Sequence, residues 1–434
     1  MKKDIVMTTL LSVNAPSATG VRAGAFGNAT HLICRACGEQ TALGPFYACM
    51  ECFGPLEVGY SFPRVTRAEI EAGPPSIWRY APLLPVPADI ATFRSTDPGF
   101  TRLVDAANLA ADLGLKQLWV KDDSGNPTHS FKDRVVAVAL SAARELGFKV
   151  LACPSTGNLA NAVAAAAARA GITSVVFVPE NLEKQKILAS AVYDTTLIAV
   201  QGTYDDVNKM ASEIAGEEDS WAFVNVNVRP YYSEGSKTLA FEIAEQLGWR
   251  LPDQIVIPVA SGSQLTKIDK GIAELITLGL VEDKPVKIYG AQATGCSPIA
   301  QAFRAGYDVV KPVKPDTIAK SLAIGNPADG PYVLDVVRRT GGLIADVDDE
   351  TVVENIQRLA RTEGIFAETA GGVTVGVTAK LISDGVLDPE AETVVINSGD
   401  GLKTLDAIAD KVGPKTTIAP RYEAFVDFWK EYRS

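Results

Sequence analysis

The chain of 434 residues is 47% hydrophobic and 21% charged, with a formal net charge of −11. Roughly 150 residues per domain predicts two to three packing units, and the ordinary globular composition excludes a largely disordered chain, a collagen-like fibre and a coiled coil. The acidic balance disfavours nucleic acid and anionic membranes as partners. Because the only histidines are His31 and His129, a Ser/His/Asp triad or a His-rich metal site has too few residues to be built. Lysine, carboxylates or a cofactor must carry any chemistry.

The first 30 residues predict a flexible tail. Small residues, Pro and Gly without periodicity fill positions 14–30, and the apolar run before Val13 is short and interrupted, unlike a signal peptide. No stretch approaches the roughly 20 uninterrupted apolar residues that span a bilayer. We therefore expect a cytoplasmic protein without a membrane partner.

Residues 31–60, here called the four-cysteine unit, contain two Cys-x2-Cys pairs separated by eleven residues: Cys34, Cys37, Cys49 and Cys52. Two such pairs can place four thiolates tetrahedrally around one ion, the arrangement that structural Zn2+ prefers. Four free thiols in a small hairpin remain the alternative. Zinc ribbons also occur in nucleic-acid machinery, so a regulatory protein is a rival interpretation, although the acidic charge disfavours it.

A Pro-rich connection over residues 73–87, expected to run extended over a larger body, leads to the main part of the chain. From about residue 101, short β-branched runs alternate with longer helical ones. Strands are expected at Gln117–Lys121, Lys149–Pro154, Ser174–Pro179, Thr196–Gln201, Ala222–Asn227, Gln254–Ala260, Lys287–Ala293 and Thr393–Asn397, and helices at Ser130–Leu146, Leu159–Ala170 and Glu234–Leu247. This alternation predicts an α/β fold with a mostly parallel sheet and helices on both faces.

Three of the expected strands end in loops rich in Gly and in hydroxyl or amide side chains: residues 153–158, 259–264 and 397–401. In open α/β sheets, ligands lie outside the carboxyl ends of the strands, where helix N-termini point at anions. Together the three loops predict an anion-binding edge of the sheet.

A turn over residues 126–131, Asn-Pro-Thr-His-Ser-Phe, opens into an expected helix at Lys132-Asp133-Arg134. A lone lysine is usually a solvated charge, but a lysine that forms a Schiff base needs a rigid, partly desolvated position near the active edge of the sheet. The turn before Lys132, with Phe131 beside it, supplies such a position. Lys132 is therefore the candidate catalytic residue.

This segment resembles the pyridoxal-phosphate (PLP) lysine motif of threonine synthases, which belong to the tryptophan-synthase-like, fold type II PLP enzymes. Three further segments are similar to that family's motifs: Ser155-Thr156-Gly157-Asn158, Glu234-Gly235-Ser236-Lys237-Thr238 and Ser398-Gly399-Asp400-Gly401-Leu402-Lys403. One branch of these synthases carries a similar four-cysteine unit, including the ending Glu51-Cys52-Phe53-Gly54-Pro55-Leu56-Glu57. The match covers about residues 31–405 in order.

The resemblance implies a tryptophan-synthase-β-like fold: two open, mostly parallel α/β domains with helices on both faces, plus a zinc-ribbon-like unit. The larger, PLP-binding domain would comprise residues 61–104 and 236–434, and the smaller one residues 105–235. A homodimer is the usual state among relatives. The implied cofactor is PLP, with structural Zn2+ in the four-cysteine unit.

The resemblance also implies roles for single residues. Lys132, beside Phe131, would hold PLP as a Schiff base and then shuttle protons; Asn158 would bind the phenolic oxygen of PLP and Ser398 would face its pyridine nitrogen. The PLP phosphate would lie in the loop formed by Ser261, Gly262, Ser263, Gln264 and Leu265. The substrate carboxylate would be held by Ser155, Thr156 and Gly157 at a helix N-terminus, and Arg134 and Lys237 are candidates for the substrate phosphate.

Two segments depart from the family's pattern. The expected phosphate loop has one glycine where many members have Gly-Asn-x-Gly-Asn, and a Ser/Gly turn without a ligand is the alternative. Many relatives have Asn-Pro-x-Arg where this chain has Arg229 before the proline and Tyr232 in place of the arginine. The ligand of the substrate phosphate is therefore open at this point.

The activity implied by the resemblance is the conversion of O-phospho-L-homoserine and water to L-threonine and phosphate, the last step of threonine biosynthesis. Serine/threonine dehydratases share part of these motifs, as does a cysteate synthase branch that acts on phosphoserine and sulfite, and both remain alternatives. Beyond the matched region, the aromatic segment Tyr422–Tyr432 is expected to form a helix that packs on the parent domain.

Overall fold

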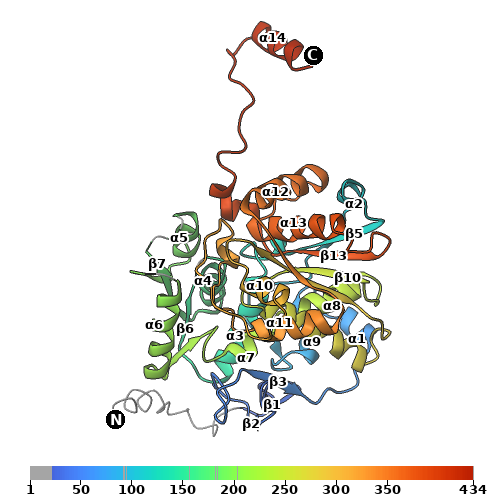
Figure 1. Cartoon of the computed structure of the whole chain (residues 1–434). Helices are drawn as coiled ribbons and strands as arrows, with labels where there is room; N and C mark the ends of the chain where they lie inside the picture. Colours follow the sequence, from blue (N-terminus) through green and yellow to red (C-terminus); the bar gives the residue numbers. More distant parts are fainter. Residues whose placement is uncertain are drawn as a thin grey trace, which may run out of the picture.

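We describe a computed structural model of residues 22–433, apart from residues 91, 92, 94, 156, 181, 183 and 203. Most of the expected tail, residues 1–21, lies outside the described part. Residues 22–30 do not continue such a tail, because Phe26 is buried and stacks on Tyr231 with the ring centroids 4.8 Å apart. The described chain forms three sheets with helices packed around two of them (Figure 1).

The four-cysteine unit forms a small antiparallel sheet at one end of the molecule (Figure 1). Its strands are β1 (Ala29–Cys34), β2 (Gln40–Thr41) and β3 (Leu56–Tyr60), in the order β2-β1-β3. Leu32, Leu56 and Val58 are buried and belong to the same hydrophobic cluster as residues of α7 (Arg229–Glu234) and α9 (Ser263–Thr277). The unit is therefore part of the main core and not a separate appendage.

The larger sheet has six strands in the order β12-β11-β10-β13-β5-β4. The strands are β4 (Arg102–Asp105), β5 (Gln117–Asp122), β10 (Gln254–Pro258), β11 (Lys287–Ala293), β12 (Ile344–Val347) and β13 (Glu392–Asn397). All neighbours are parallel except β4 and β5. The central strands β10 and β13 are buried along their whole length, as expected for a parallel sheet covered on both faces.

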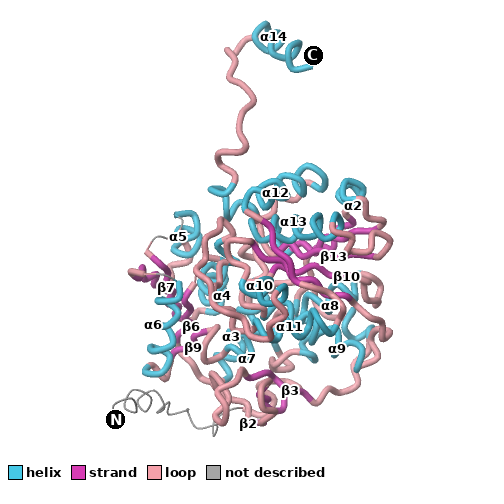
Figure 2. Tube along the Cα trace, viewed as in Figure 1, coloured by secondary structure: helices cyan, strands magenta, loops and turns pink. Residues whose placement is uncertain are grey.

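Helices cover both faces of this sheet (Figure 1, Figure 2). One face of the sheet is covered by α13 and α2, and α12 packs on both of these helices. The other face is covered by α9 and α11, with α8 packed against α9. The bounds are α1 (Arg67–Glu71), α2 (Ala107–Leu113), α8 (Lys237–Gln246), α9 (Ser263–Thr277), α10 (Pro298–Arg304), α11 (Gly330–Arg339), α12 (Asp349–Glu363) and α13 (Thr369–Ser383).

The smaller sheet has four parallel strands in the order β8-β7-β6-β9. They are β6 (Val150–Pro154), β7 (Thr173–Pro179), β8 (Thr196–Val200) and β9 (Trp221–Phe223), and the accompanying helices are α3 (Lys132–Glu145), α4 (Asn158–Ala170), α5 (Lys184–Ala191), α6 (Tyr204–Glu217) and α7 (Arg229–Glu234). The Ala-rich α4 is buried from Leu159 to Ala167, which lets it pack closely against α3 and the sheet.

The mixed α/β fold with mostly parallel sheets is confirmed. Three details differ from the expectations. The strand expected at the start of the smaller domain, β5, pairs with β13 of the larger sheet, so the sheets do not divide at residue 105. The expected helix Glu234–Leu247 begins later, as α8 at Lys237, because Glu234 ends the separate short helix α7. Part of the connection expected to be extended forms a 3-10 helix, Ile77–Leu83.

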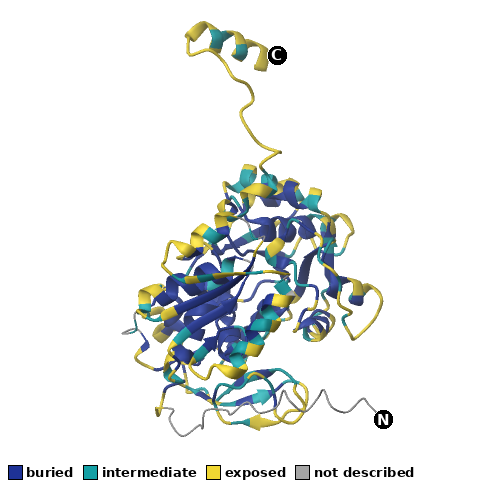
Figure 3. Cartoon of the chain, turned by 90° about the vertical axis from the view of Figure 1, so that its left-hand side faces the viewer, coloured by how far each residue is buried: buried dark blue, intermediate teal, exposed yellow. Residues whose placement is uncertain are grey.

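The aromatic segment near the C-terminus forms α14 (Tyr422–Arg433), but none of its residues is buried. A long connection carries this helix away from the body, so it does not pack on the parent domain as expected (Figure 3). Its aromatic side chains stack on one another instead, as in the pair Phe425 and Trp429 with ring centroids 6.0 Å apart. Among the described residues, no helix has the length and apolar character needed to cross a membrane.

Candidate active site

A cavity of about 250 Å³ lies where loops from both parallel sheets converge. Its wall includes Pro154, Ser155 and Asn158 after β6, residues 258–264 except Val259 after β10, and Ser398 after β13. The three loops that the sequence singles out therefore meet at one place. The loops after β10 and β13 meet because parallel strands of one sheet end at the same edge, whereas the loop after β6 comes from the smaller sheet.

Lys132 is held rigidly at the start of α3. The backbone N–H and the hydroxyl of Thr128 donate to the Asp133 carboxylate at 2.8 and 2.9 Å. The N–H of Phe131 donates to the carbonyl of Ser398 at 2.9 Å, which joins this turn to the loop after β13. Both ends of the segment are thus fixed, and Lys132 and Phe131 line the cavity.

The side chain of Lys132 is half-buried and lines the cavity, so its amine is chemically available. Its Nζ lies 4.6 Å from the ring centroid of Phe131, and within the described part of the chain it makes no hydrogen bond or ion pair. Burial lowers the pKa of Lys132 to about 8, while the carboxylate of Glu368 acts in the opposite direction. A substantial neutral fraction of this amine near pH 8 suits a nucleophile or base.

Glu368, which the sequence reasoning did not single out, connects the two residues expected to contact the PLP ring. Its carboxylate accepts from the Asn158 amide at 2.8 Å and from the Ser398 hydroxyl at 3.0 Å. It immediately precedes α13 and lines the cavity. Its partners lie 210 and 30 residues away in the sequence, so no local motif could reveal the contact; a single acidic residue before a helix is the only signal.

The expected phosphate loop turns sharply into the N-terminus of α9. Gly262 has φ +102°, and a Cβ placed there would lie 2.5 Å from Val333 Cγ2, so this position requires glycine. Ser261, Gly262, Ser263 and Gln264 line the cavity. The side chain of Leu265 lies in the hydrophobic core, and only its backbone N–H is left to serve a ligand.

The loop after β6 turns into the N-terminus of α4. The Ser155 hydroxyl accepts from the N–H groups of Gly157 and Ala160 at 3.0 and 2.9 Å. Gly157 has φ +137°, and a Cβ there would lie 2.5 Å from Lys186 Cδ. Ser155 lines the cavity and Gly157 stands directly behind it as the N-cap of α4. Thr156 lies outside the described residues.

Two expected substrate ligands do not reach the cavity. The guanidinium of Arg134 is fully buried between the carboxylates of Asp123 and Glu242. Residues two apart on a helix point about 200° apart, so Arg134 points away from the face that Lys132 occupies. The ammonium of Lys237 is likewise fully buried, 2.7 Å from Glu234 and 2.9 Å from Glu274. Neither cation is available to a substrate phosphate, and the sequence-based assignment of both is corrected.

The residues of the cavity fit a polar ligand. Five buried side-chain polar atoms without a hydrogen-bond partner in the described structure belong to residues that line it: Asn158 Oδ1, Asn225 Oδ1, Ser236 Oγ, Gln264 Nε2 and Ser321 Oγ. Buried polar groups are normally satisfied. Their concentration around one cavity, beside the free amine of Lys132, fits a cofactor with several polar groups such as PLP.

The four cysteines also come together. Their Sγ atoms all lie within 4.8 Å of one another, with 3.5 Å between Cys34 and Cys52 and 3.7 Å between Cys37 and Cys49. Tetrahedral Zn2+ with bonds of about 2.3 Å needs sulfur atoms about 3.8 Å apart. The cluster fits this requirement, and none of these thiols is in a disulfide.

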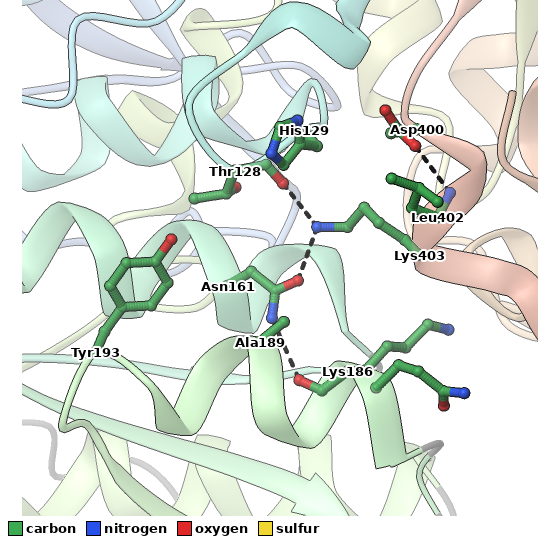
Figure 4. Close-up of a pocket in the computed structure, with 10 residues that line it drawn as sticks. Thr128, His129, Asn161, Lys186, Ala189, Tyr193, Asp400, Leu402 and Lys403 are labelled. Carbon is green, nitrogen blue, oxygen red and sulfur yellow. Dashed lines mark hydrogen bonds between the residues drawn. The ribbon is translucent and has the colours of Figure 1, made fainter. Parts of the chain in front are cut away.

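A second, smaller cavity of about 140 Å³ adjoins the turn before Lys132. Lys403 lines it, and Figure 4 shows its Nζ between Thr128 and Asn161, donating to the carbonyl of Thr128 at 2.7 Å and to Asn161 Oδ1 at 2.8 Å. His129 stands beside it with φ +62°. Lys403 therefore joins the loop after β13 to both the Lys132 turn and α4.

Comparisons with known proteins place this site in a family. A family model described as pyridoxal-phosphate dependent enzyme matches residues 94–399. The threonine synthase of Methanocaldococcus jannaschii is 37% identical over 380 residues, which cover 86% of this chain and 93% of the relative. The chain belongs to the threonine synthase family of pyridoxal-phosphate dependent enzymes. A second threonine synthase, from Methanosarcina acetivorans, is 34% identical over 91% of this chain and 97% of its own length.

Solved structures of other enzymes share the fold of this threonine synthase family member. A fungal L-serine ammonia-lyase from Rhizomucor miehei superposes with a TM-score of 0.63 at 22% identity, covering 73% of this chain and 99% of that one. Maize serine racemase gives a TM-score of 0.58 at 21% identity, over 80% of this chain and 96% of its own. The resemblance, the fold type and the dependence on PLP are thus confirmed, and the chain is a PLP-dependent lyase of this family.

Proposed function

We propose that this chain converts O-phospho-L-homoserine and water to L-threonine and inorganic phosphate. One observation carries the proposal: the half-buried, unpaired amine of Lys132 lies in a cavity built from three strand-end loops and surrounded by unsatisfied polar atoms. Membership in the threonine synthase family supplies the reaction class.

PLP, when bound, stabilises negative charge at the carbon atoms next to the substrate amino group. Lys132 would hold it covalently, with Phe131 packed alongside. Asn158 and Ser398 are the polar partners for its ring, and the loop of Ser261, Gly262, Ser263 and Gln264 is the partner for its phosphate. At that loop the backbone N–H groups at the start of α9, a helix of 15 residues, attract an anion.

Lys132 is the base of the reaction. When it is not bonded to the cofactor, its neutral amine would take the proton from Cα of the substrate. In the net conversion Cβ loses one proton and gains the hydroxyl of water, Cγ loses the phosphate oxygen and gains one proton, and Cα regains the proton that it lost. The ammonium of Lys132 can return protons to carbon. Among the described residues that line the cavity, Glu368 is the other side chain with a carboxyl or amine group, and it is therefore the second candidate for proton transfer.

The substrate carboxylate is assigned to the N-terminus of α4. The backbone N–H groups there, with the hydroxyl of Ser155, form an anion site next to Asn158. Thr156 and Gly157 complete the loop in this proposal. The proposal extends to structural Zn2+ on the four cysteines, a cytoplasmic location and a homodimer.

The decisive experiment is a product assay in water enriched in oxygen-18. We expect equal amounts of threonine and phosphate from O-phospho-L-homoserine, one heavy oxygen in the threonine hydroxyl and none in the phosphate, because the bond from Cγ to oxygen is broken. The variant Lys132→Ala is the inactive control, and Lys116→Ala, which removes an exposed lysine paired with Glu390, is the matched active one.

Other products would identify the alternatives. Ammonia and a 2-oxo acid from serine or threonine, without threonine from the phosphorylated substrate, would indicate a dehydratase. Cysteate from phosphoserine and sulfite would indicate the cysteate synthase reaction. Either result would overturn the proposed substrate while leaving PLP dependence in place.

A further inference from the structure

The four-cysteine unit contributes directly to the wall of the active-site cavity. Its Tyr47 lines the cavity together with Arg229 and Tyr232 of α7. The unit is distant from the cofactor loops in sequence, and a structural metal ribbon does not require such a contact. The cavity thus has a third component besides the two α/β sheets.

The helix that carries Arg229 is fastened to this unit. The Tyr231 hydroxyl accepts from the N–H of Gly44 at 2.9 Å and donates to the Gly44 carbonyl at 3.1 Å. At the other end of α7, the Glu234 carboxylate accepts from the Tyr60 hydroxyl at 2.7 Å. Tyr231 and Glu234 are buried, so α7 cannot shift without breaking these bonds.

A chain of charges joins the cysteine pair to Arg229. Arg35, between Cys34 and Cys37, lies 3.6 Å from one oxygen of the buried Asp329 carboxylate. The other oxygen accepts from the guanidinium of Arg229 at 2.6 Å. Arg35 is fixed by stacking on Tyr332, 3.8 Å from the ring centroid. Arg35 also lies 3.7 Å from Glu57, so the two arginines are matched by two carboxylates, and Asp329 is shared between both arginines.

Arg229 is the cation that this cavity offers to a second anion. Among the described lining residues, the charged cations are Lys132 and Arg229, and Lys132 is assigned to the cofactor. The side chain of Arg229 is 21% exposed, and the bond to Asp329 occupies one of its five N–H donors. Guanidinium is well suited to a phosphate because its forked donors match the oxygens.

We propose that the four-cysteine unit completes the substrate site: Arg229 binds the phosphate of the substrate, and Arg35 positions Arg229 through Asp329. The identity of the anion rests on the proposed function. Arg229 would contact the substrate, whereas Arg35 and Asp329 are positioning residues.

The test compares four variants of the PLP-loaded enzyme: Arg229→Met, Asp329→Asn, Arg35→Met and Arg35→Lys. Arg22→Met is the matched control, because Arg22 pairs with Glu145 at 3.4 Å on the surface. For each we would measure KM and kcat for O-phospho-L-homoserine, the Kd for inorganic phosphate by calorimetry, and the Kd for PLP. Thermal unfolding and the visible absorbance of bound PLP verify that each variant folds.

We expect Arg229→Met to raise both KM and the phosphate Kd about 30-fold, which corresponds to the loss of a charge-assisted bond. Arg35→Met and Asp329→Asn should raise both about 3-fold to 10-fold with kcat within about 2-fold, a smaller effect because Arg229 itself remains. Arg35→Lys should recover part of the loss. Arg22→Met should match the unmodified enzyme.

Three results would overturn the proposal. Unchanged KM and phosphate Kd in Arg229→Met would remove the anchor. A loss of PLP affinity in that variant, without a change in phosphate Kd, would assign Arg229 to the cofactor. Normal values in both Arg35→Met and Asp329→Asn would remove the positioning role. By contrast, phosphate binding that depends on Arg229 and Arg35 in a chain that makes no threonine would overturn the proposed function alone.

Discussion

Replacing Arg134 with methionine tests whether this residue is structural, as its buried ion pairs indicate, or a substrate ligand, as the sequence suggested. Its guanidinium donates to Asp123 at 2.8 Å through two nitrogens and also pairs with Glu242, and all three side chains are fully buried. Methionine preserves much of the volume and leaves two buried carboxylates facing Lys121 alone. Breaking a buried pair of this kind costs about 3–5 kcal/mol of unfolding free energy.

The assay is chemical unfolding of the PLP-loaded variant together with steady-state kinetics. We expect the stability to fall by about 3–5 kcal/mol while KM for O-phospho-L-homoserine stays within about 2-fold, because Arg134 does not line the cavity. Arg338→Met is the control; its pair with Asp308 is exposed, and surface pairs contribute about 0–1 kcal/mol. A variant with normal stability and a KM raised more than about 10-fold would refute the structural assignment.

Three further predictions concern the cofactor, the phosphate loop and the metal. The rate at which PLP combines with the cofactor-free chain, followed by stopped-flow absorbance, should rise as pH passes about 8, because the neutral amine of Lys132 is the form that reacts. Glu368→Gln should move the midpoint of this pH profile to lower pH, because the charge of Glu368 raises the pKa of Lys132. A midpoint that does not move in this variant would contradict the assignment. In fluorescence titrations, Gly262→Ala should weaken PLP binding at least about 10-fold. Gly279→Ala is the control and should leave PLP binding unchanged, because Gly279 also has a positive φ, +68°, but has open space around it. Elemental analysis should find one zinc per chain, and Cys49→Ser should lose it; an unmodified chain free of metal when purified without chelators would count against the zinc assignment.

The meeting of the loops after β10 and β13 was predictable from the sequence, because parallel strands of one sheet end at the same edge. The approach of the loop after β6 was not predictable from that rule, because β6 belongs to the smaller sheet and its loop reaches the cavity through the packing of the two sheets and their helices. The placement of β5 in the larger sheet was not predictable in this way. Its partner β13 lies about 275 residues further along the chain, as the contact between Asp122 and Asn397 shows, and local patterns carry no information about such pairing.

The site residues also divide into those that local sequence identifies and those that depend on long-range contacts. Lys132 and its rigid turn were identified from local sequence, and the structure brings Lys132, Asn158 and Ser398 to one cavity. Arg134 and Lys237 were chosen for their closeness to motifs, but helix periodicity and burial direct both into ion-pair networks. Glu368 was missed because its role depends on Asn158 and Ser398, which other elements supply. Sequence proximity thus identifies a catalytic turn more reliably than it identifies a ligand.

The central claim is that Lys132 holds the cofactor covalently. Borohydride reduction of the PLP-loaded enzyme fixes the cofactor on the amine that carries it, and peptide mass mapping then locates that amine. The account predicts the added mass on the peptide that contains Lys132, and no fixed cofactor in Lys132→Ala. Modification of a different lysine, such as Lys186 or Lys403 beside the second cavity, or a chain that retains no PLP at all, would contradict it.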